Sequence, residues 1–168
     1  MINRIRMLFC GLVLVVGHTV SSAQDSSDVF SRIDKLVTEK QQPGWKLVKK
    51  RVYPKIAQLL YEWKQGKSFA VVHVFIYTSS EEASTRFKAL PTLLKVGGID
   101  TGGIDMTVLQ AKVPGLGDEN FLWEGFYTER LFGVDFRSGR VVVHTSASSF
   151  SVAEQFALQI AEAIPPPG

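Results

Sequence analysis

Two histidines are the side chains whose type and spacing come nearest to a chemical site. His73 and His144 each stand inside a valine-rich apolar segment, and the alternation of side chains places both on the same face of a sheet. Neighbouring imidazoles can bind zinc, but a zinc site takes three or four ligands and no carboxylate obviously completes this one. The favoured interpretation is therefore two partly buried histidines, with a His73/His144 metal site as the alternative.

No pattern predicts a catalytic or cofactor-binding residue. The single cysteine, Cys10, lies in the N-terminal apolar run, and the sequence has no Gly-x-Ser-x-Gly elbow for an activated serine. Serines near 79–80 and 146–151 fit helix capping. Gly115-Leu-Gly117 is not followed by the Lys-Ser/Thr pair of a phosphate-binding loop.

The N-terminus has the features of an export signal. Arg4 and Arg6 precede an apolar run over 7–16, and small residues follow at Ser21-Ser-Ala23. This order predicts a secretory signal peptide over 1–23, cleaved after Ala23, with an uncleaved anchor as the alternative. The apolar run is shorter than the ~20 residues that span a bilayer, so we expect no stable membrane insertion after cleavage. The predicted location is periplasmic or extracellular.

The charge of the processed chain excludes a typical nucleic-acid-binding protein. Removing Arg4 and Arg6 from the 19 basic residues leaves 17 against 16 acidic residues. One local excess of positive charge remains in the segment 46–55, where Lys49, Lys50 and Arg51 are consecutive. Such a run is usually a solvated face, and binding of an anionic envelope component is the alternative.

Hydrophobic periodicity predicts an alternation of strands and helices. A helix from Ser27 ends before Pro43-Gly44, and an edge strand follows at 45–55. Further strands are predicted at 56–63, 69–77, 104–111, 119–124, 130–137 and 140–145, and further helices at 79–94 and from Ser149 or Ser151 onward.

The order of these elements predicts a single α+β domain over 24–168. Two ββα-type pseudo-repeats, at about 56–96 and 119–164, build an antiparallel sheet; a shift of 69 residues superposes Phe87 on Phe156. Because each repeat helix has one apolar stripe, we expect both on one face of the sheet. The N-terminal helix is expected to cover the opposite face, which carries His73 and His144.

The segment from 113 to 119, Val-Pro-Gly-Leu-Gly-Asp-Glu, leads into an aromatic strand, a basic hairpin with Val-Val-Val and an alanine-rich helix. Over about 56–164 this order resembles the extracytoplasmic sensor-type domain of actinobacterial receptor Ser/Thr kinases. The resemblance implies an α+β fold and binding of a ligand or partner, with no catalytic residues to carry over.

Aromatic residues near the predicted hairpin ends suggest a binding surface, because such groups can line a pocket or a partner interface. The sequence thus predicts an exported, non-enzymatic protein that binds a small ligand or an envelope protein. The alternatives are a structural or assembly factor acting through the basic 46–55 edge, and an enzyme with an unrecognised site. The candidate surface consists of Trp63, Trp123, Phe126, Tyr127, Arg130, Lys49, Lys50 and Arg51.

Overall fold

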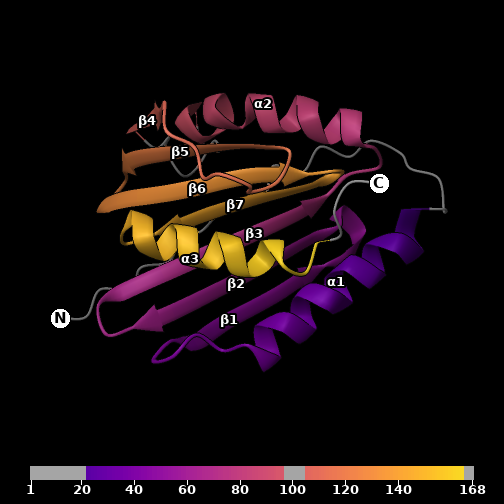
Figure 1. Ribbon diagram of the computed structural model, residues 1–168, viewed down its shortest axis with the longest axis horizontal. Coiled ribbons are helices and arrows are strands. Elements are labelled where there is room, and N and C mark those ends of the chain that lie inside the picture. The colour runs from indigo at the N-terminus through magenta and orange to yellow at the C-terminus, as the bar shows by residue number, and fades with distance from the viewer. Residues whose placement is uncertain (1–21, 97–104, 165–168) are drawn as a thin grey trace.

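The computed structural model describes residues 22–96 and 105–164, and within them three α-helices accompany a seven-stranded antiparallel sheet (Figure 1). The predicted α+β class is therefore confirmed. The predicted signal peptide lies almost wholly outside these ranges and stays a prediction. The elements are α1 (Ser22–Glu39), β1 (Lys46–Tyr53), the 3-10 turn η1 (Pro54–Ile56), β2 (Gln58–Gln65), β3 (Ser68–Ile76), α2 (Ser80–Val96), β4 (Asp105–Leu109), β5 (Glu119–Phe126), β6 (Arg130–Ser138), β7 (Val141–Ala147) and α3 (Phe150–Ala161).

The sheet consists of two meanders joined at its centre. The strand order is β1-β2-β3-β7-β6-β5-β4, so β3 pairs with β7 and the margins are β1 and β4. Two-residue connections close the β2–β3 and β6–β7 hairpins, where Gly66 and Gly139 have φ of 57° and 56°. Only glycine adopts such angles without strain, which is why these two turns were predictable from the sequence.

Helix starts follow the predicted capping residues. Ser149 accepts a hydrogen bond from the backbone N–H of Val152 at the start of α3. At the start of α2, Ser79 Oγ accepts from the N–H of Glu82 at 3.1 Å, which is the predicted capping-box contact. Pro91 lies inside α2, and the helix continues through it.

The main core lies between the sheet and the helices α1 and α3. Val72, Val74 and Val143 point to this side and belong to the same buried cluster as Ile33 of α1 and Phe156 of α3. Phe156 packs against Trp63 of β2, with ring centroids 4.6 Å apart. Figure 1 shows α1 and α3 lying across the near side of the sheet.

The predicted placement of the helices is wrong. Phe87 of α2 packs on Phe121 at 5.1 Å and shares a buried cluster with Val142, which points away from α1 and α3. The two helices of the proposed repeats therefore lie on opposite faces, and α1 lies beside α3 instead of over the histidines. Phe87 and Phe156 do not share a layer, so the structure does not show the pseudo-repeat that their superposition predicted.

The physical reason lies in the length of two short connections. Three residues, 77–79, join β3 to α2, whereas two residues, 148–149, join β7 to α3. Successive residues of an extended chain point to opposite faces, so one additional residue changes the face from which the helix begins.

The contacts of Phe156 predict a large loss of stability on truncation. Phe156 is fully buried between Trp45 and Trp63, so Phe156→Ala should lower the free energy of unfolding by about 3–5 kcal/mol because it opens a cavity. Urea unfolding measures this change. Leu158→Ala is the matched control on the exposed side of α3 and should change the free energy by less than about 0.5 kcal/mol. Equal losses in the two variants would contradict the assigned core.

Candidate functional site

The two histidines meet at the centre of the sheet. His73 of β3 and His144 of β7 are direct register partners, and their ring centroids are 6.2 Å apart at an interplanar angle of 87°. The prediction that both lie on one face is confirmed. That face is the one that carries α2.

Asp135 of β6 holds His144 in place. His144 Nδ1 lies 2.9 Å from both carboxylate oxygens, and Asp135 Oδ1 also accepts the backbone N–H of Thr145 at 3.1 Å. Trp123 of β5 donates its Nε1–H to the same oxygen at 3.1 Å. Three donor groups, of which His144 Nδ1 lies between both oxygens, therefore surround a carboxylate that is fully buried, which is the condition for burying such a group at all.

A glycine makes room for the indole ring above this carboxylate. Gly133 is the cross-strand partner of Trp123, and a Cβ at Gly133 would come within 1.9 Å of the indole. With that space open, the ring crosses β6 and stacks on His144, with centroids 5.5 Å apart and planes within 4° of parallel.

Gln58 of β2 supports the second histidine. Its Nε2 lies 3.2 Å from Nδ1 of His73. Burial is the largest of the causes that lower the pKa of His73 from 6.5 to about 3. The nearby His144 and the charge of Lys49 lower it further. The imidazole of His73 is therefore neutral at physiological pH.

A histidine oriented by a carboxylate is a familiar arrangement in general-base catalysis and in metal binding. Catalysis requires a substrate to reach the imidazole, however, and His73, His144 and Asp135 are all buried. Within the described ranges, no three His, Cys, Asp or Glu side chains are arranged to hold a metal ion. The geometry indicates a structural polar cluster that links β5, β6 and β7.

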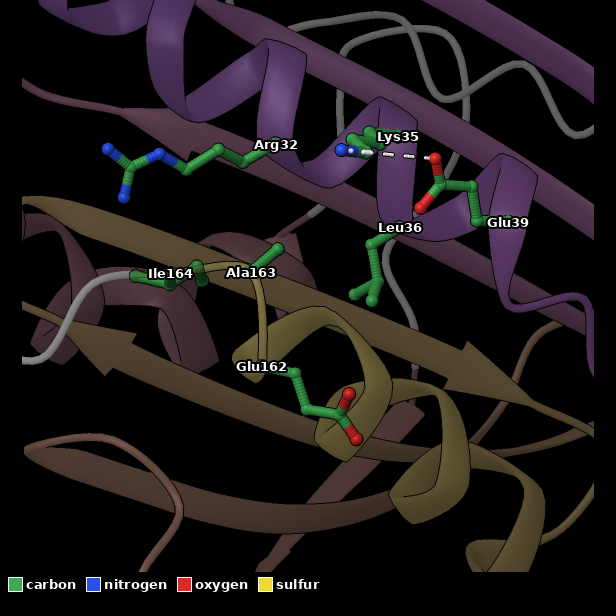
Figure 2. A pocket seen from close by; sticks show the side chains of 7 residues that line it. All are labelled: Arg32, Lys35, Leu36, Glu39, Glu162, Ala163 and Ile164. Atoms are coloured by element: carbon green, nitrogen blue, oxygen red, sulfur yellow. Dashed lines mark ion pairs between the residues drawn. The ribbon is translucent and has the colours of Figure 1, made fainter.

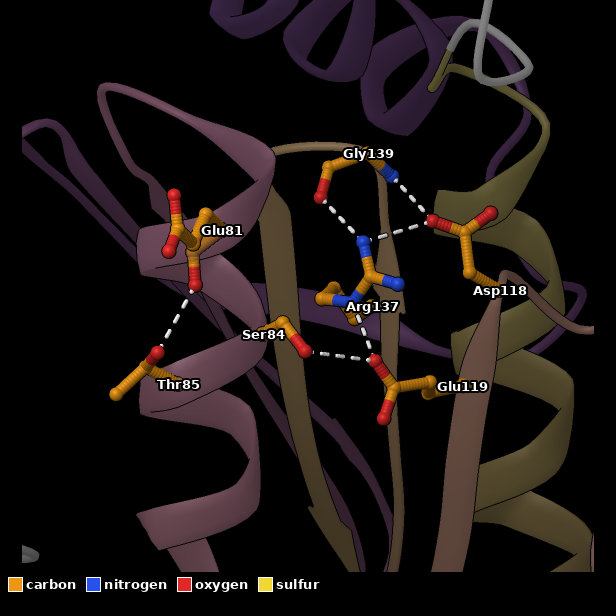
Figure 3. Close-up of polar contacts among 7 residues, drawn as sticks. All are labelled: Glu81, Ser84, Thr85, Asp118, Glu119, Arg137 and Gly139. Carbon is orange, nitrogen blue, oxygen red and sulfur yellow. Dashed lines mark hydrogen bonds and ion pairs between the residues drawn. The ribbon is translucent and has the colours of Figure 1, made fainter.

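A second polar cluster joins the β6–β7 hairpin to α2 and to the segment before β5 (Figure 3). Arg137 contacts Asp118 at 2.8 Å, Glu119 at 2.9 Å and the carbonyl oxygen of Gly139 at 2.7 Å, and Glu119 also accepts from Ser84 of α2 at 3.0 Å. Partial burial acts to raise the pKa of Glu119, but the hydrogen bonds from Arg137 and Ser84 outweigh it and the pKa is lowered. Arg137 thus links two carboxylates and the carbonyl of the β6–β7 turn, which indicates a structural role for the cluster.

A shallow groove of about 450 Å³ lies between α1 and the end of α3 (Figure 2). Leu36, Ala163 and Ile164 form its apolar lining. Charged groups on its rim are paired locally, since Lys35 lies 4.0 Å from Glu39 and Glu162 accepts from Lys40 at 2.6 Å. The groove therefore presents apolar surface with a neutralised rim.

The predicted binding surface does not form one patch. Trp63 and Trp123 are buried on opposite faces of the sheet and belong to the core. Phe126 and Tyr127 are exposed at the β5–β6 turn, and Arg130 beside them pairs with Glu124 at 2.8 Å.

Lys49, Lys50 and Arg51 lie on β1, at the margin of the sheet opposite to β4. Lys50 points to the α1 side, where its Nζ is 2.5 Å from Asp34 and Tyr61 donates to the same carboxylate. Burial, with the adjacent charge of Asp34, raises the pKa of Tyr61. The structure thus separates an aromatic tip from a basic edge strand.

Sequence reasoning missed Asp135 and Gln58. One signal for Asp135 was available, because an acidic residue between Val134 and Phe136 in an otherwise apolar strand needs a buried partner. Gln58 gave no comparable signal, since a glutamine at the start of a strand is ordinary.

Together, the antiparallel sheet and the helices on its two faces define an α+β protein. No protein-family model matches the sequence, and no curated protein matches it significantly. Among solved structures, the chain is similar to the extracellular domain of PknH from Mycobacterium tuberculosis, with a TM-score of 0.49 and 10% identity over 87% of this chain and 97% of that chain. The sequence resembles the extracytoplasmic domains of receptor kinases, and this solved structure is one of them. Likeness at this level carries no information about ligand or role.

The lowered pKa of His73 predicts acid sensitivity. In the unfolded chain the pKa of His73 is near 6.5, so the unfolded state binds a proton at this imidazole below pH 6.5. The folded state binds that proton only near pH 3. The stability present above pH 6.5 should therefore fall by up to about 1.4 kcal/mol per pH unit as the pH decreases through that window. His73→Phe should remove this part of the slope.

Urea unfolding between pH 7 and pH 5, above the range in which most carboxylates titrate, measures the slope. Leu158→Ala should keep the wild-type slope because that side chain is exposed and far from any titrating group of the cluster. An unchanged slope in His73→Phe would refute the assignment.

Proposed function

We propose that this chain is an exported, non-enzymatic binding protein that accepts an extended acidic segment of a partner protein along the outer edge of β1. The observation that carries the proposal is that β1 ends the sheet while presenting both exposed apolar and basic side chains.

The backbone of β1 supports strand addition. It pairs with β2 on one side only, so its other side presents backbone donors and acceptors with no strand partner in the described sheet. An extended peptide can hydrogen-bond to such an edge and thereby lengthen the sheet. A bulge between Leu47 and Lys49 leaves a regular stretch over 49–53 for pairing.

Side chains along β1 indicate the chemistry of the partner. Val48 and Val52 are 44% and 47% exposed, Leu47 is also exposed, and so is Ile56 in the turn η1 that follows the strand. Apolar side chains in this number favour a partner that contributes its own β-branched residues.

The basic side chains of β1 then determine which apolar partner strands can pair with it. Lysine and arginine along an edge repel basic strands and discourage neutral ones, whereas a strand with acidic residues finds opposite charges across the ladder. Lys50 already forms an ion pair with Asp34. Lys49 and Arg51 are therefore the cations of the regular stretch that remain for an acidic partner strand.

Export is supported by the basic start, apolar run and small residues of 1–23. A helix that could cross a bilayer is not found in the part of the chain that the structure describes. The non-enzymatic role is supported by the burial of the His144–Asp135 pair, which keeps substrates away from the imidazole. Binding of a small ligand is the alternative; its candidate site is the groove between α1 and α3, whose charged groups are paired with each other.

A synthetic peptide of alternating Glu and Val tests the edge directly. We expect amide shifts confined to residues 49–53 in nuclear magnetic resonance titrations, with affinity that falls as salt is added because the charges are near the surface. A Lys-Val peptide of equal length should not bind.

The double variant Arg51→Glu, Val52→Glu should weaken binding of the Glu-Val peptide by tenfold or more. Lys112→Glu, a charge reversal at an exposed loop position, is the matched control and should leave the affinity unchanged. Binding that the edge variant does not affect, or that shifts residues of the groove instead, would reject this function.

A further inference from the structure

The end of the sheet at which the β2–β3 and β5–β6 hairpins turn forms a second exposed surface, which we call the hairpin end. Register pairing brings the first residues of β3 and β6 to the same end, since both Ala70 and Phe132 are opposite Ala147. Figure 1 shows both hairpins turning on the same side of the molecule. We propose that the hairpin end binds the surface of an anionic phospholipid bilayer.

An aromatic tip is the first observation. Phe126 is 58% exposed, more than any other large hydrophobic side chain in the described ranges, and the adjacent Tyr127 is 43% exposed. Exposing two neighbouring aromatic rings at a turn is costly in water, so the pair points to a surface that covers them.

The tip is anchored rather than loose. Arg130 lies over the ring of Phe132 at 5.1 Å, and Phe132 packs against Phe150 of α3 at 4.8 Å. The backbone N–H of Tyr127 donates to the carbonyl of Glu129 at 3.2 Å, which closes the turn. The aromatic rings are thus presented on a braced hairpin.

Positive charge on the neighbouring hairpin is the second observation. Lys46 and Lys64 are direct cross-strand partners, and Lys67 lies in the β2–β3 turn; all three are exposed. Like charges placed opposite one another destabilise a strand pair, and an external anion relieves that repulsion. Glu62 offsets Lys64 only at 3.6 Å.

Acidic side chains also lie at this end, and the excess of positive charge is confined to the β2–β3 hairpin, where three lysines stand against Glu62. Glu124 is paired with Arg130, and Glu129 is partly buried. Asp105 is the cross-strand register partner of Phe126 at the β4 margin, so this exposed carboxylate lies beside the aromatic tip and away from the lysine-bearing hairpin. The hairpin end is therefore aromatic on one hairpin and cationic on the other.

Shape and chemistry together favour a bilayer as the occupant. A protruding turn suits a flat, soft surface, whereas small ligands take concave sites. Phenylalanine and tyrosine rings reside at the level of lipid headgroups, and lysines near such a surface are attracted by anionic phospholipids. This proposal is independent of strand addition at β1, because the regular stretch over 49–53 and the hairpin end have no side chain in common.

Co-sedimentation with vesicles tests the proposal, using the protein as recovered after export. We expect binding to phosphatidylcholine vesicles that contain phosphatidylglycerol, loss of binding at high salt, and little binding to phosphatidylcholine alone. Phe126→Ser, Tyr127→Ser should reduce binding by tenfold or more, and Lys64→Glu, Lys67→Glu should do the same. Leu158→Ser removes a similarly exposed hydrophobic side chain from α3 and should have no effect.

A second measurement reports insertion of the tip itself. Phe126→Trp should show additional fluorescence quenching by vesicles of brominated phosphatidylglycerol, relative to the wild-type protein, whose Trp63 and Trp123 are buried and whose Trp45 is partly buried. Absence of binding to anionic vesicles, equal binding to neutral ones, or full binding by the serine variant overturns the proposal. A dimer that forms without lipid and is lost in the serine variant would assign the tip to a second copy of the chain instead.

Discussion

The pairing of β3 with β7 is the constraint on which the rest of the structure depends. Both strands carry valines on both faces, with Val72, Val74 and Val143 on one side and Val71 and Val142 on the other. Neither face of such a central pair can remain in water, so helical cover is needed on both sides. With α1 and α3 on one face and α2 on the other, the surfaces left for partners are the margins and ends of the sheet.

Burial of this sheet explains why its most reactive-looking residues are structural. Asp135 sits opposite His144 at the centre of the face that carries α2, and its oxygens are fully hydrogen-bonded by groups from β5 and β7. A satisfied network of this kind fixes strand register, because a slip of one residue would bury the carboxylate without partners. The cluster therefore specifies how the second meander is assembled.

The sequence predicted the elements better than their mutual placement. The serine caps at Ser79 and Ser149 and the edge position of the lysine-rich strand agree with the structure. The same alternation also placed His73 and His144 on one face of the sheet, where the structure has them. By contrast, the burial of Trp63 and Trp123 could not be predicted, because the sequence pattern around a strand tryptophan is the same whether or not a helix covers that face.

Local pattern alone determined the α+β class, the hairpins and the shared face of the two histidines, because backbone geometry and side-chain alternation act within a few residues. Tertiary structure decided the rest. It placed α2 opposite α3, since the direction of a strand-to-helix crossover depends on a connection that differs by one residue. It also brought Asp135 and Gln58 to the histidines and exposed Phe126 and Tyr127, because these outcomes depend on which distant segments supply cover.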